Sequence, residues 1–528
     1  MERRSLIRGA GAAALAGALP APALAQGAAS RAIRVVPQAN LTSLDPIWTS
    51  AVVTRNHAFM VYDQLCAQDA QGEVRPQMAE GWVTENDGRD TTFTLRSGLK
   101  FHDGEPVRAA DCVASIRRWA ARDTFGQVLW LRVDAVEALD DRRFRVRLKR
   151  RFPLLLLALG QTQFPCFIMP ERIAATDPFQ QVREAIGSGP FRFVRDEWNP
   201  GQRAVWAKNE AYAPRQEPVD GLAGGRVPRI ERVEWTIITD PATAASAMTT
   251  GEQDYWEYPL HDLLPLLKRS REVVVQQRLM EGTYAICRFN HLHPPFDNPG
   301  VRRAVALAVD QRDYMRAVAG SEPDGWATCE GVFTCGTALA NEAGSEVLKV
   351  RSVERAKAAL REAGYANQRV VLLAPGDYPQ INVVSLVTAD LLGRLGINLE
   401  LVSTDWGSLV QRRASKEPVE RGGWSMIHTT SSGLALTLPV LHLFLRANGP
   451  GAWFGWPQDD EIERLRAAWI EAADAAEGLR IGEALNRRAM EVLPYIPLGF
   501  YWQPSAWRRN VTGVFRAPAT VFWNMGKA

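Results

Sequence analysis

The sequence predicts an α/β protein that divides into two or three domains. Its 528 residues are 46% hydrophobic and 23% charged, so the chain can bury more than one core. In the second half, residues 369–375, 381–396 and 397–404 have the patterns of a strand, a helix and a strand, which together form a right-handed parallel unit. In the first half, residues 74–107 alternate apolar and polar side chains between Asx-Gly turns, as antiparallel strands do.

The first 25 residues have the features of a twin-arginine export signal. Arg3 and Arg4 precede a weakly apolar run of alanine and glycine, and the small residues 23–25 form a cleavage site. A basic amphipathic helix of the mature protein is the alternative, but acid-poor stretches that end in Ala-x-Ala are typical of signals. We therefore expect residues 1–25 to be removed and the mature chain to reside in the periplasm.

The mature chain is close to neutral, which argues against a nucleic-acid partner. The full chain has a formal charge of +3, and removal of residues 1–25, with three arginines and one glutamate, lowers it to about +1. Residues 142–152 are the most basic stretch, but their basic and apolar side chains alternate, as in a strand with one solvated and one buried face. The longest apolar run, residues 154–160, is far shorter than the roughly 20 residues that span a bilayer.

The first half contains one pair of residues that suggests catalysis. A short strand at residues 31–36 and a helix at residues 54–65 come first, and the antiparallel strands then end at His102 and Asp103. Neighbouring histidine and aspartate are typical of acid–base chemistry, but here they lie in an Asp-Gly turn before a helix that begins near Ala109. We interpret the pair as a turn whose side chains diverge.

The helices of the second half have clear limits in the sequence. Residues 301–320 have the apolar spacing of one long helix. Ser352 is the expected N-cap of the next helix, and Gly364 is its expected stop. Together with the strand–helix–strand unit, these helices make the second half an α/β domain.

Of the six cysteines, only Cys329 and Cys335 are close in sequence. The stretch between them contains Gly331 and looks able to fold back, and an exported compartment allows the pair to oxidise. A zinc site is the alternative, but it needs four ligands, and no second pair of Cys or His lies nearby. We expect a disulfide that stabilises the fold by about 2 kcal/mol.

Several stretches resemble the large periplasmic solute-binding proteins of peptide and nickel ABC importers, the dipeptide- and oligopeptide-binding family. They span most of the mature chain and include residues 74–116, "GSGPFRFV" at 187–194, "NEAYAP" at 209–214, residues 289–310 and "PLGFYWQP" at 497–504. The resemblance implies an α/β protein with the type II periplasmic-binding-protein clamshell, in which a hinge joins two α/β lobes. It also implies an extra α+β domain.

The resemblance also implies limits for each domain. Lobe I is expected to contain residues 26–60, 187–285 and 500–528. The extra domain is expected at residues 61–186, and lobe II at residues 286–499.

The resemblance implies a receptor that captures a small peptide or peptide-like solute between its lobes and delivers it to the permease of an ABC importer in the inner membrane. It implies a monomer without a cofactor. We expect no catalytic step, and no G-x-S-x-G, H-E-x-x-H or P-loop pattern stands out in the chain. Two alternatives stay open: a periplasmic hydrolase acting on a peptide-like substrate, and a clamshell chaperone or sensor.

Peptide-binding members of the family hold the free amino group of the ligand with an aspartate just after the strand that is residues 422–429 here. In this sequence, residues 428–442 contain no carboxylate. Because a buried ammonium needs a counter-ion, we expect a ligand whose head group is neutral or anionic. The alternative is that Asp405 reaches in from the neighbouring loop. The expected receiving side chains are His428, Thr429, Thr430 and Ser431.

Trp406 is a further candidate for the same site, and Tyr284, Asn40 and Trp48 are weaker candidates. Trp406 follows the strand at 397–404, where the family places an aromatic pocket wall. Tyr284, Asn40 and Trp48 are placed by loops at the expected lobe edges, although each could equally belong to the core.

Two nearby histidines raise the possibility of a metal site. His291 and His293 share one face of a strand, and some relatives carry nickel. A metal would still need a third and a fourth ligand, so we expect none.

Overall fold

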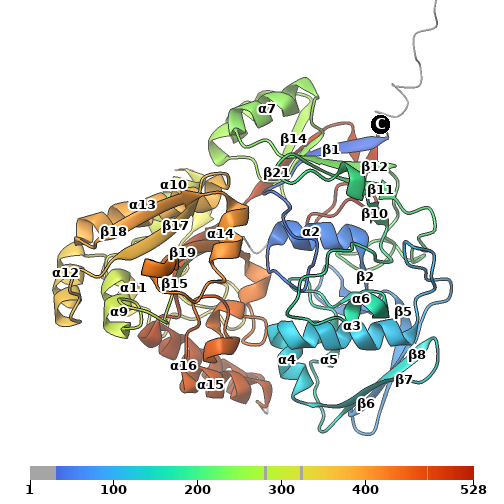
Figure 1. Ribbon diagram of the computed structural model, residues 1–528, viewed down its shortest axis with the longest axis horizontal. Helices are drawn as coiled ribbons and strands as arrows, with labels where there is room; N and C mark the ends of the chain where they lie inside the picture. Colours follow the sequence, from blue (N-terminus) through green and yellow to red (C-terminus); the bar gives the residue numbers. More distant parts are fainter. Residues whose placement is uncertain (1–30, 279–281, 321–324, 473) are drawn as a thin grey trace, which may run out of the picture.

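The computed structural model describes residues 31–278, 282–320, 325–472 and 474–528. Two large sheets lie side by side, each with its own helices, and a smaller sheet lies below the one on the right of Figure 1. We use lobe I for the part built on the seven-stranded sheet, lobe II for the part built on the six-stranded sheet, and extra domain for the part built on the four-stranded sheet. The predicted export signal lies outside the described residues.

Lobe I is built on a mixed sheet with the strand order β10-β11-β12-β1-β13-β21-β14. Its central strand β1 runs parallel to β12 and β13, and the other pairs are antiparallel. The strands are β1 (Ala32–Val36), β10 (Phe191–Phe193), β11 (Arg203–Lys208), β12 (Arg232–Thr236), β13 (Tyr255–Trp256), β14 (Val273–Gln277) and β21 (Pro504–Arg508). Helices α2 (Val52–Val61), α7 (Pro241–Thr250) and α8 (Leu264–Arg269) accompany them.

Lobe II is built on a sheet with the order β16-β20-β15-β19-β17-β18. Its strands are β15 (Thr283–Phe289), β16 (Trp326–Ala327), β17 (Val370–Pro375), β18 (Leu399–Thr404), β19 (Met426–Ser432) and β20 (Tyr495–Tyr501). Its helices are α9 (Pro299–Ala306), α10 (Gln311–Ala319), α11 (Glu346–Lys349), α12 (Val353–Glu362), α13 (Pro379–Leu395), α14 (Trp406–Arg412), α15 (Asp460–Ile470) and α16 (Ala475–Val492).

The predicted strand–helix–strand unit of lobe II is confirmed as β17, α13 and β18. β17 and β18 pair in parallel from Val370 and Leu399 onward. Every residue of β17 is buried, which is typical of a strand covered on both faces. Pro379 occupies the first turn of α13, and Gly396 ends the helix with φ of 77°.

The helix predicted at residues 301–320 is wrong as a single element. The structure has α9 and α10 instead, because the Asp310 side chain caps a new helix by accepting the Arg312 N–H at 3.0 Å. The limits predicted for α12 are confirmed: Ser352 Oγ accepts the Arg355 N–H at 3.2 Å, and Gly364 follows the C-cap with φ of 78°.

The extra domain is an antiparallel sheet of order β5-β6-β8-β7 covered by helices. Its main elements are β5 (Ala79–Glu85), β6 (Asp90–Leu95), β7 (Val133–Ala138), β8 (Arg143–Leu148), α3 (Ala109–Arg122), α4 (Thr124–Trp130), α5 (Leu155–Leu159) and α6 (Glu171–Ala174). The alternation predicted for the basic strand is confirmed, because Phe144, Val146 and Leu148 of β8 are buried. Short strands complete the fold: β2 (Asp63–Gln64), β3 (Cys66–Gln68), β4 (Val74–Pro76), β9 (Phe167–Ile168), β22 (Val511–Thr512) and β23 (Gly526–Lys527).

The His102 and Asp103 side chains diverge, as the turn interpretation requires. His102 Nε2 lies 3.0 Å from the Gly189 carbonyl, whereas Asp103 pairs with Arg172 at 3.2 Å. Gly104 has φ of 93°, a conformation that suits glycine in a tight turn. Both side chains therefore support the local structure.

The domain limits expected from the sequence stay a prediction, and two of them cut through strands. The limit at 285/286 falls inside β15, and the limit at 499/500 falls inside β20, yet both strands pair along their length in the sheet of lobe II. The chain enters lobe II after β14 and returns to lobe I before β21. The two connections are adjacent, because Thr283 and Tyr501 are paired residues.

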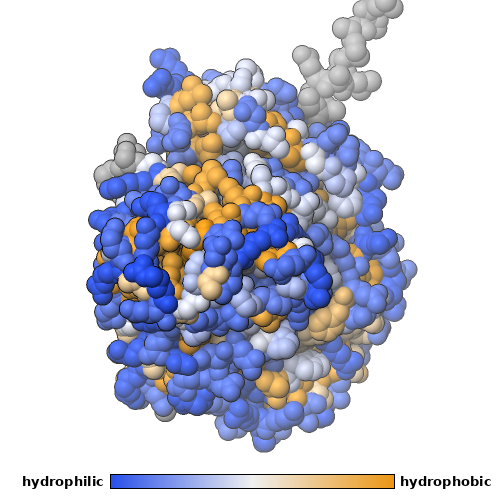
Figure 2. All heavy atoms as spheres, turned by 60° about the vertical axis from the view of Figure 1, so that its left-hand side comes forward, coloured by the Kyte–Doolittle hydropathy of each residue, from blue (hydrophilic) through white to orange (hydrophobic). Residues whose placement is uncertain are grey.

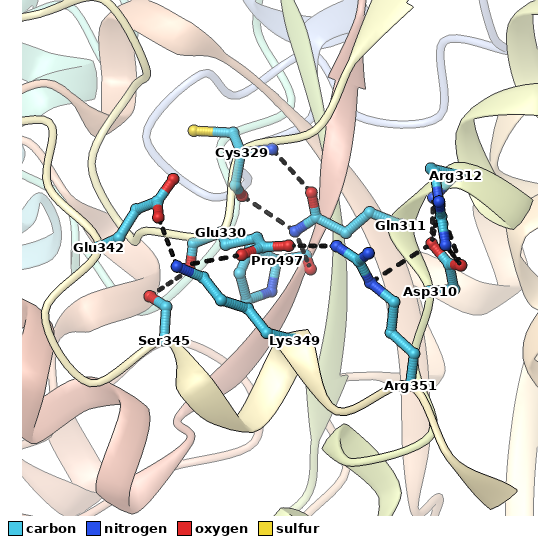
Figure 3. A network of polar contacts seen from close by, with 10 residues as sticks. All are labelled: Asp310, Gln311, Arg312, Cys329, Glu330, Glu342, Ser345, Lys349, Arg351 and Pro497. Atoms are coloured by element: carbon cyan, nitrogen blue, oxygen red, sulfur yellow. Dashed lines mark hydrogen bonds and ion pairs between the residues drawn. The ribbon is translucent and has the colours of Figure 1, made fainter.

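The structure joins Cys329 and Cys335 in a disulfide with a Cα–Cα distance of 5.9 Å. Figure 3 shows how Gln311 holds Cys329: Gln311 accepts the Cys329 N–H at 2.7 Å and donates to the Cys329 and Pro497 carbonyls, both at 2.9 Å. The next residue, Glu330, pairs with Arg351 at 2.6 Å. The other four cysteines are buried and free: Cys66, Cys112, Cys166 and Cys287.

Replacing both Cys329 and Cys335 with serine should lower the free energy of unfolding by about 2 kcal/mol. The loop they close spans a sequence separation of 6, and so short a loop restricts the unfolded chain only modestly. Urea unfolding followed by circular dichroism measures the change. Reductant serves as the control, because it should destabilise the wild-type protein and leave the double variant unchanged. Equal stability of both proteins without reductant would contradict the expectation.

Hydrophilic residues dominate the face shown in Figure 2, with one larger hydrophobic patch in its upper half. Leu386 on α13 and Leu401 on β18 are 48% and 38% exposed. Among the described residues, no helix has both the length and the apolar character needed to cross a membrane.

Candidate functional site

A cavity with a volume of about 40 Å³ lies where the two lobes and the extra domain meet. A water molecule needs roughly 10–15 Å³ of such space, so the cavity suits a small head group. Its lining residues are Gln38, Ser50, Ala51, Val52 and Arg55 from lobe I, Gln163 and Phe164 from the segment after α5, and Tyr378, Ile381, Trp406, Arg413, residues 429–432, Leu443, Phe444 and Trp453 from lobe II.

The two lobes touch each other around this cavity. The Tyr378 hydroxyl of lobe II donates to Gln38 Oε1 of lobe I at 2.6 Å. Trp453 Nε1 of lobe II donates to Ser50 Oγ of lobe I at 3.3 Å. These direct contacts show that the lobes are closed on each other. Both lobes therefore contribute residues to the cavity wall.

Arg413 contributes the most unusual side chain of the cavity. It follows α14, is 2% exposed, and lies against three rings: Trp406 at 5.7 Å, Trp453 at 5.3 Å and Phe454 at 4.9 Å from its guanidinium carbon. Its Nε and Nη2 atoms are buried and have no hydrogen-bond partner in the described part of the chain. Burial lowers the pKa of Arg413 to about 9. The guanidinium is therefore a buried cation whose donors are free for a ligand.

Arg55 is a second buried arginine, on α2, and it has one hydrogen-bond partner for its guanidinium, while its Nε has none in the described part of the chain. Its Nη1 donates to Gln163 Oε1 at 2.5 Å. Burial lowers the pKa of Arg55, and the nearby Tyr258 and Glu257 act in the opposite direction. Glu257 lies behind the cavity wall, where it accepts the Gln38 N–H at 2.9 Å and Asn56 Nδ2 at 2.6 Å. Arg55 is thus partly neutralised within lobe I.

The cavity wall as a whole is positive. Its charged members are Arg55 and Arg413, and none of the described residues that line it is an aspartate or a glutamate. A buried charge without a counter-ion costs several kcal/mol, and an anionic ligand would remove that cost. The wall therefore favours an anion and disfavours a cation.

The structure brings Thr429, Thr430, Ser431 and Trp406 together in the cavity wall. Thr429–Ser431 lie at the end of β19, beside Tyr378, whose pKa is raised by burial despite its hydrogen bond with Thr430. The Trp406 N–H donates to Asp377 Oδ1 at 2.6 Å, and the Trp406 ring meets Tyr378 edge-on with centroids 5.1 Å apart. These hydroxyls offer donors to a ligand next to the guanidinium of Arg413.

Four other expected site residues do not line this cavity. His428 faces the opposite side of β19 from Thr429, because successive strand residues alternate, and its ring nitrogens lie 3.0 Å from Ser385 Oγ and 2.9 Å from Thr388 Oγ1. The Tyr284 hydroxyl accepts the Cys335 N–H at 2.9 Å, and Asn40 accepts the Gly201 N–H at 2.9 Å. Trp48 lines a neighbouring chamber instead.

Asp405, the alternative anchor for an ammonium, is exposed and does not line the cavity. Its Oδ1 caps α14 by accepting the Ser408 N–H at 2.9 Å. No other carboxylate takes the missing position among the described lining residues.

The two histidines considered for a metal bind to backbone instead. His291 Nε2 lies 3.4 Å from the Pro494 carbonyl, and His293 Nε2 lies 2.8 Å from the Lys416 carbonyl. Within the described ranges, no group of three or more His, Cys, Asp or Glu side chains is arranged to hold a metal ion.

The spacing between Trp406 and Arg413 in the sequence indicates that Arg413 belongs to the same site. Arg413 is seven residues after Trp406, and this spacing places both on the same face of a helix. If the residue at the start of α14 lines the cavity, the residue two helical turns later is therefore expected to line it as well. Arg55 and Gln38 had no such signal, because they reach the cavity from the other lobe.

Comparisons with known proteins show the family of this chain. The family described as bacterial extracellular solute-binding proteins, family 5, matches residues 73–437. A probable peptide ABC transporter periplasmic-binding protein of Sinorhizobium fredii is 37% identical over 536 residues, which cover 100% of both chains. The glutathione-binding protein of Escherichia coli strain K12 is 25% identical over 512 residues, with 94% of each chain covered.

A solved structure shows the same fold. The periplasmic binding protein in complex with agropinic acid from A. tumefaciens R10 superposes with a TM-score of 0.78 at 22% identity, covering 94% of this chain and 99% of that chain. The clamshell architecture and the family expected from the sequence are both confirmed. The chain belongs to family 5 of the bacterial extracellular solute-binding proteins.

Proposed function

We propose that this protein is the periplasmic receptor of an ABC importer and that it captures a small, anionic, peptide-like solute between its two lobes. The observation that carries the proposal is the Arg413 guanidinium, which is 2% exposed and has two buried N–H groups without a partner in the described residues. A carboxylate of the solute supplies the missing counter-ion. Arginine and carboxylate form strong paired hydrogen bonds, so this contact selects for charge as well as position.

The other polar groups of the cavity can hold the solute by hydrogen bonds without reacting with it. Thr429 and Thr430 offer hydroxyls, and Gln38 offers an amide from the other lobe. His428 is not placed to act as a base for these hydroxyls, because its two ring nitrogens lie against Ser385 and Thr388 of α13. The proposal therefore includes no bond cleavage, and the protein releases the solute unchanged.

Lobe closure links capture to transport. A solute that touches both lobes stabilises the closed arrangement, because only there do Gln38 and Arg413 face one cavity. The closed receptor then delivers the solute to the permease in the inner membrane. The names of two relatives fit this role, since one is a probable peptide transporter component and the other binds glutathione.

The route to the periplasm and the oligomeric state complete the proposal. Arg3 and Arg4 support export through the twin-arginine pathway, with removal of residues 1–25. We expect a monomer that binds no nucleic acid.

A matched set of alanine dipeptides tests the charge of the solute. The set contains N-acetyl-Ala-Ala as the anion, its amide as the neutral form, and Ala-Ala-amide as the cation. We expect the anion to bind at least tenfold more tightly than the cation in isothermal titration, and to raise the melting temperature most. X-ray scattering on the same samples should show compaction with the anion alone.

The control is unmodified Ala-Ala, which carries the same carboxylate together with a free ammonium. It should bind more weakly than the acetylated acid, because the cavity offers no carboxylate to the ammonium among its described lining residues. Binding of Ala-Ala-amide that equals or exceeds binding of the acid would refute the proposal. Turnover of any of these compounds would favour the hydrolase alternative.

A further inference from the structure

A second chamber adjoins the proposed solute cavity. Its volume is about 100 Å³, and it shares Ser50, Phe164, Leu443 and Trp453 with the first cavity. All three parts of the protein contribute to it: the loop before α2 in lobe I, the junction of α3 and α4 in the extra domain, and the segment after Leu443 in lobe II.

The wall of this chamber is chiefly apolar. Ile47, Trp48, Trp119, Leu443, Trp453 and Phe454 supply most of its large side chains. For comparison, an apolar cavity of roughly 150 Å³ accommodates benzene. The chamber therefore has room for an apolar group of about four carbons, and a larger ring would extend beyond it.

The polar groups of the wall already have partners in the protein. Arg122 Nη2 donates to the Trp48 carbonyl at 3.1 Å, and its guanidinium stacks on the Trp48 ring at 5.1 Å. Asp123 accepts the Gly126 N–H at 2.8 Å and Gln161 Nε2 at 2.9 Å. Trp119 Nε1 donates to the Phe164 carbonyl at 2.9 Å. A guest in this chamber thus gains from apolar contact and needs no hydrogen bond there.

The aromatic residues that surround Arg413 separate the two chambers. Trp453 lines both, and Phe454, whose ring lies 4.9 Å from the Arg413 guanidinium, lines the second chamber. One solute can therefore hold its anionic group at Arg413 and place a neighbouring group in the second chamber. The reverse orientation is disfavoured, because an anion in the second chamber would lie beside the carboxylate of Asp123.

We infer that the second chamber is a subsite for a small apolar side group, so that the solute is an acid with a branched aliphatic side chain of about four carbons. This inference rests on the proposed function, because it places the acid group at Arg413. It adds a specificity that the charge of the cavity alone does not give. The chamber selects the solute by its uncharged side group.

The test compares N-acetylalanine with N-acetylleucine, two acids that differ only in the size of the side chain. Leucine has three more carbons than alanine, and burial of each such group favours binding severalfold. We expect N-acetylleucine to bind the wild-type protein roughly thirtyfold more tightly in isothermal titration. N-acetylleucinamide, which keeps the side chain and lacks the charge, should bind much more weakly than the leucine acid.

Three variants locate the gain in affinity. Thr49 lines the second chamber and is absent from the lining of the first, so Thr49→Phe fills the subsite, and we expect the leucine-to-alanine affinity ratio to fall to about one. Thr49→Ser keeps the hydroxyl that accepts the Ala51 N–H, and it should keep the ratio of the wild-type protein. Trp48→Ala, which removes a wall instead of filling space, should also lower the ratio.

Each outcome separates this inference from the proposed function. If both acids bind equally, or if the ratio survives in Thr49→Phe, the subsite is refuted while capture of an anion stands. If the amides bind as well as the acids, the proposed function fails. If neither acid binds the wild-type protein, both fail.

Discussion

Arg413→Met should make the solute-free protein more stable, although it removes a side chain from the centre of the site. Burial lowers the pKa of Arg413 from 12.5 to about 9, because its charge is desolvated without a counter-ion. The contacts with Trp406, Trp453 and Phe454 offset only part of that cost. Methionine fills a similar volume without the charge, so we expect a gain of about 2 kcal/mol in the free energy of unfolding.

The same variant should lose its response to acids. N-acetyl-Ala-Ala should raise the melting temperature of the wild-type protein and leave that of Arg413→Met unchanged, because the counter-ion of the solute has been removed. Differential scanning calorimetry with and without the dipeptide measures both effects. A stable protein that no longer binds is the pattern expected of a residue kept for function at a cost in stability.

Arg412→Met is the matched control, because it changes the neighbouring residue in the same way. The Arg412 guanidinium donates to the Gly422 and Gly423 carbonyls at 2.9 and 3.0 Å, away from the cavity. This variant should lose a little stability and keep its response to the dipeptide. If Arg413→Met instead destabilises the protein and still binds, Arg413 has a structural partner and the proposed role is wrong.

Acid should destabilise the protein strongly between about pH 6.5 and pH 3. His57, His428 and His442 are fully buried, and desolvation by burial lowers the pKa of each from 6.5 to about 3. Between these values the unfolded chain binds protons that the folded chain excludes, so stability falls as pH falls. Each histidine contributes on the order of 4 kcal/mol to the loss, and above pH 6.5 the contribution vanishes.

His428→Gln isolates one of these contributions. Glutamine can still pair with Ser385 and Thr388, but it does not take up a proton in this range. Urea unfolding at pH 7 and pH 4.5 should show a smaller loss on acidification in the variant than in the wild-type protein. His293→Gln provides the control, because His293 is only partly buried, and it should follow the wild-type curve. An unchanged pH dependence in His428→Gln would show that the ring accepts a proton inside the fold.

The elements that could be predicted from sequence are those whose signal is local. The parallel unit of β17, α13 and β18 has a continuous apolar strand, a proline at the first helical turn and a glycine stop. The apolar spacing at residues 301–320 continues through a break that one capping side chain, Asp310, determines. A pattern of buried positions therefore predicts the faces of helices better than their ends.

The candidate site also shows which residues a local sequence pattern can and cannot predict. Trp406 lines the cavity from the start of α14, two residues after β18, where α/β proteins place their sites. Thr429 lines it from within β19. His428 shares a face of β19 with Thr430 but lies two residues earlier, under α13, where its ring contacts Ser385 and Thr388 instead of the cavity. Arg55 and Gln38 enter from a lobe that is far away in sequence, so no local pattern could have placed them beside Arg413.

The two connections between the lobes lie next to each other and form the hinge of the clamshell. Because β15 and β20 pair where the chain enters and leaves lobe II, we expect the lobes to turn about a line near Thr283 and Tyr501. On opening, points move in proportion to their distance from that line. Arg132, just after α4 of the extra domain, pairs with Glu471, just after α15 of lobe II, at 2.7 Å, and Figure 1 shows α4 and α15 in its lower half, away from β21. We therefore expect the side of this ion pair to separate most on opening, and a solute to enter and leave the cavity there.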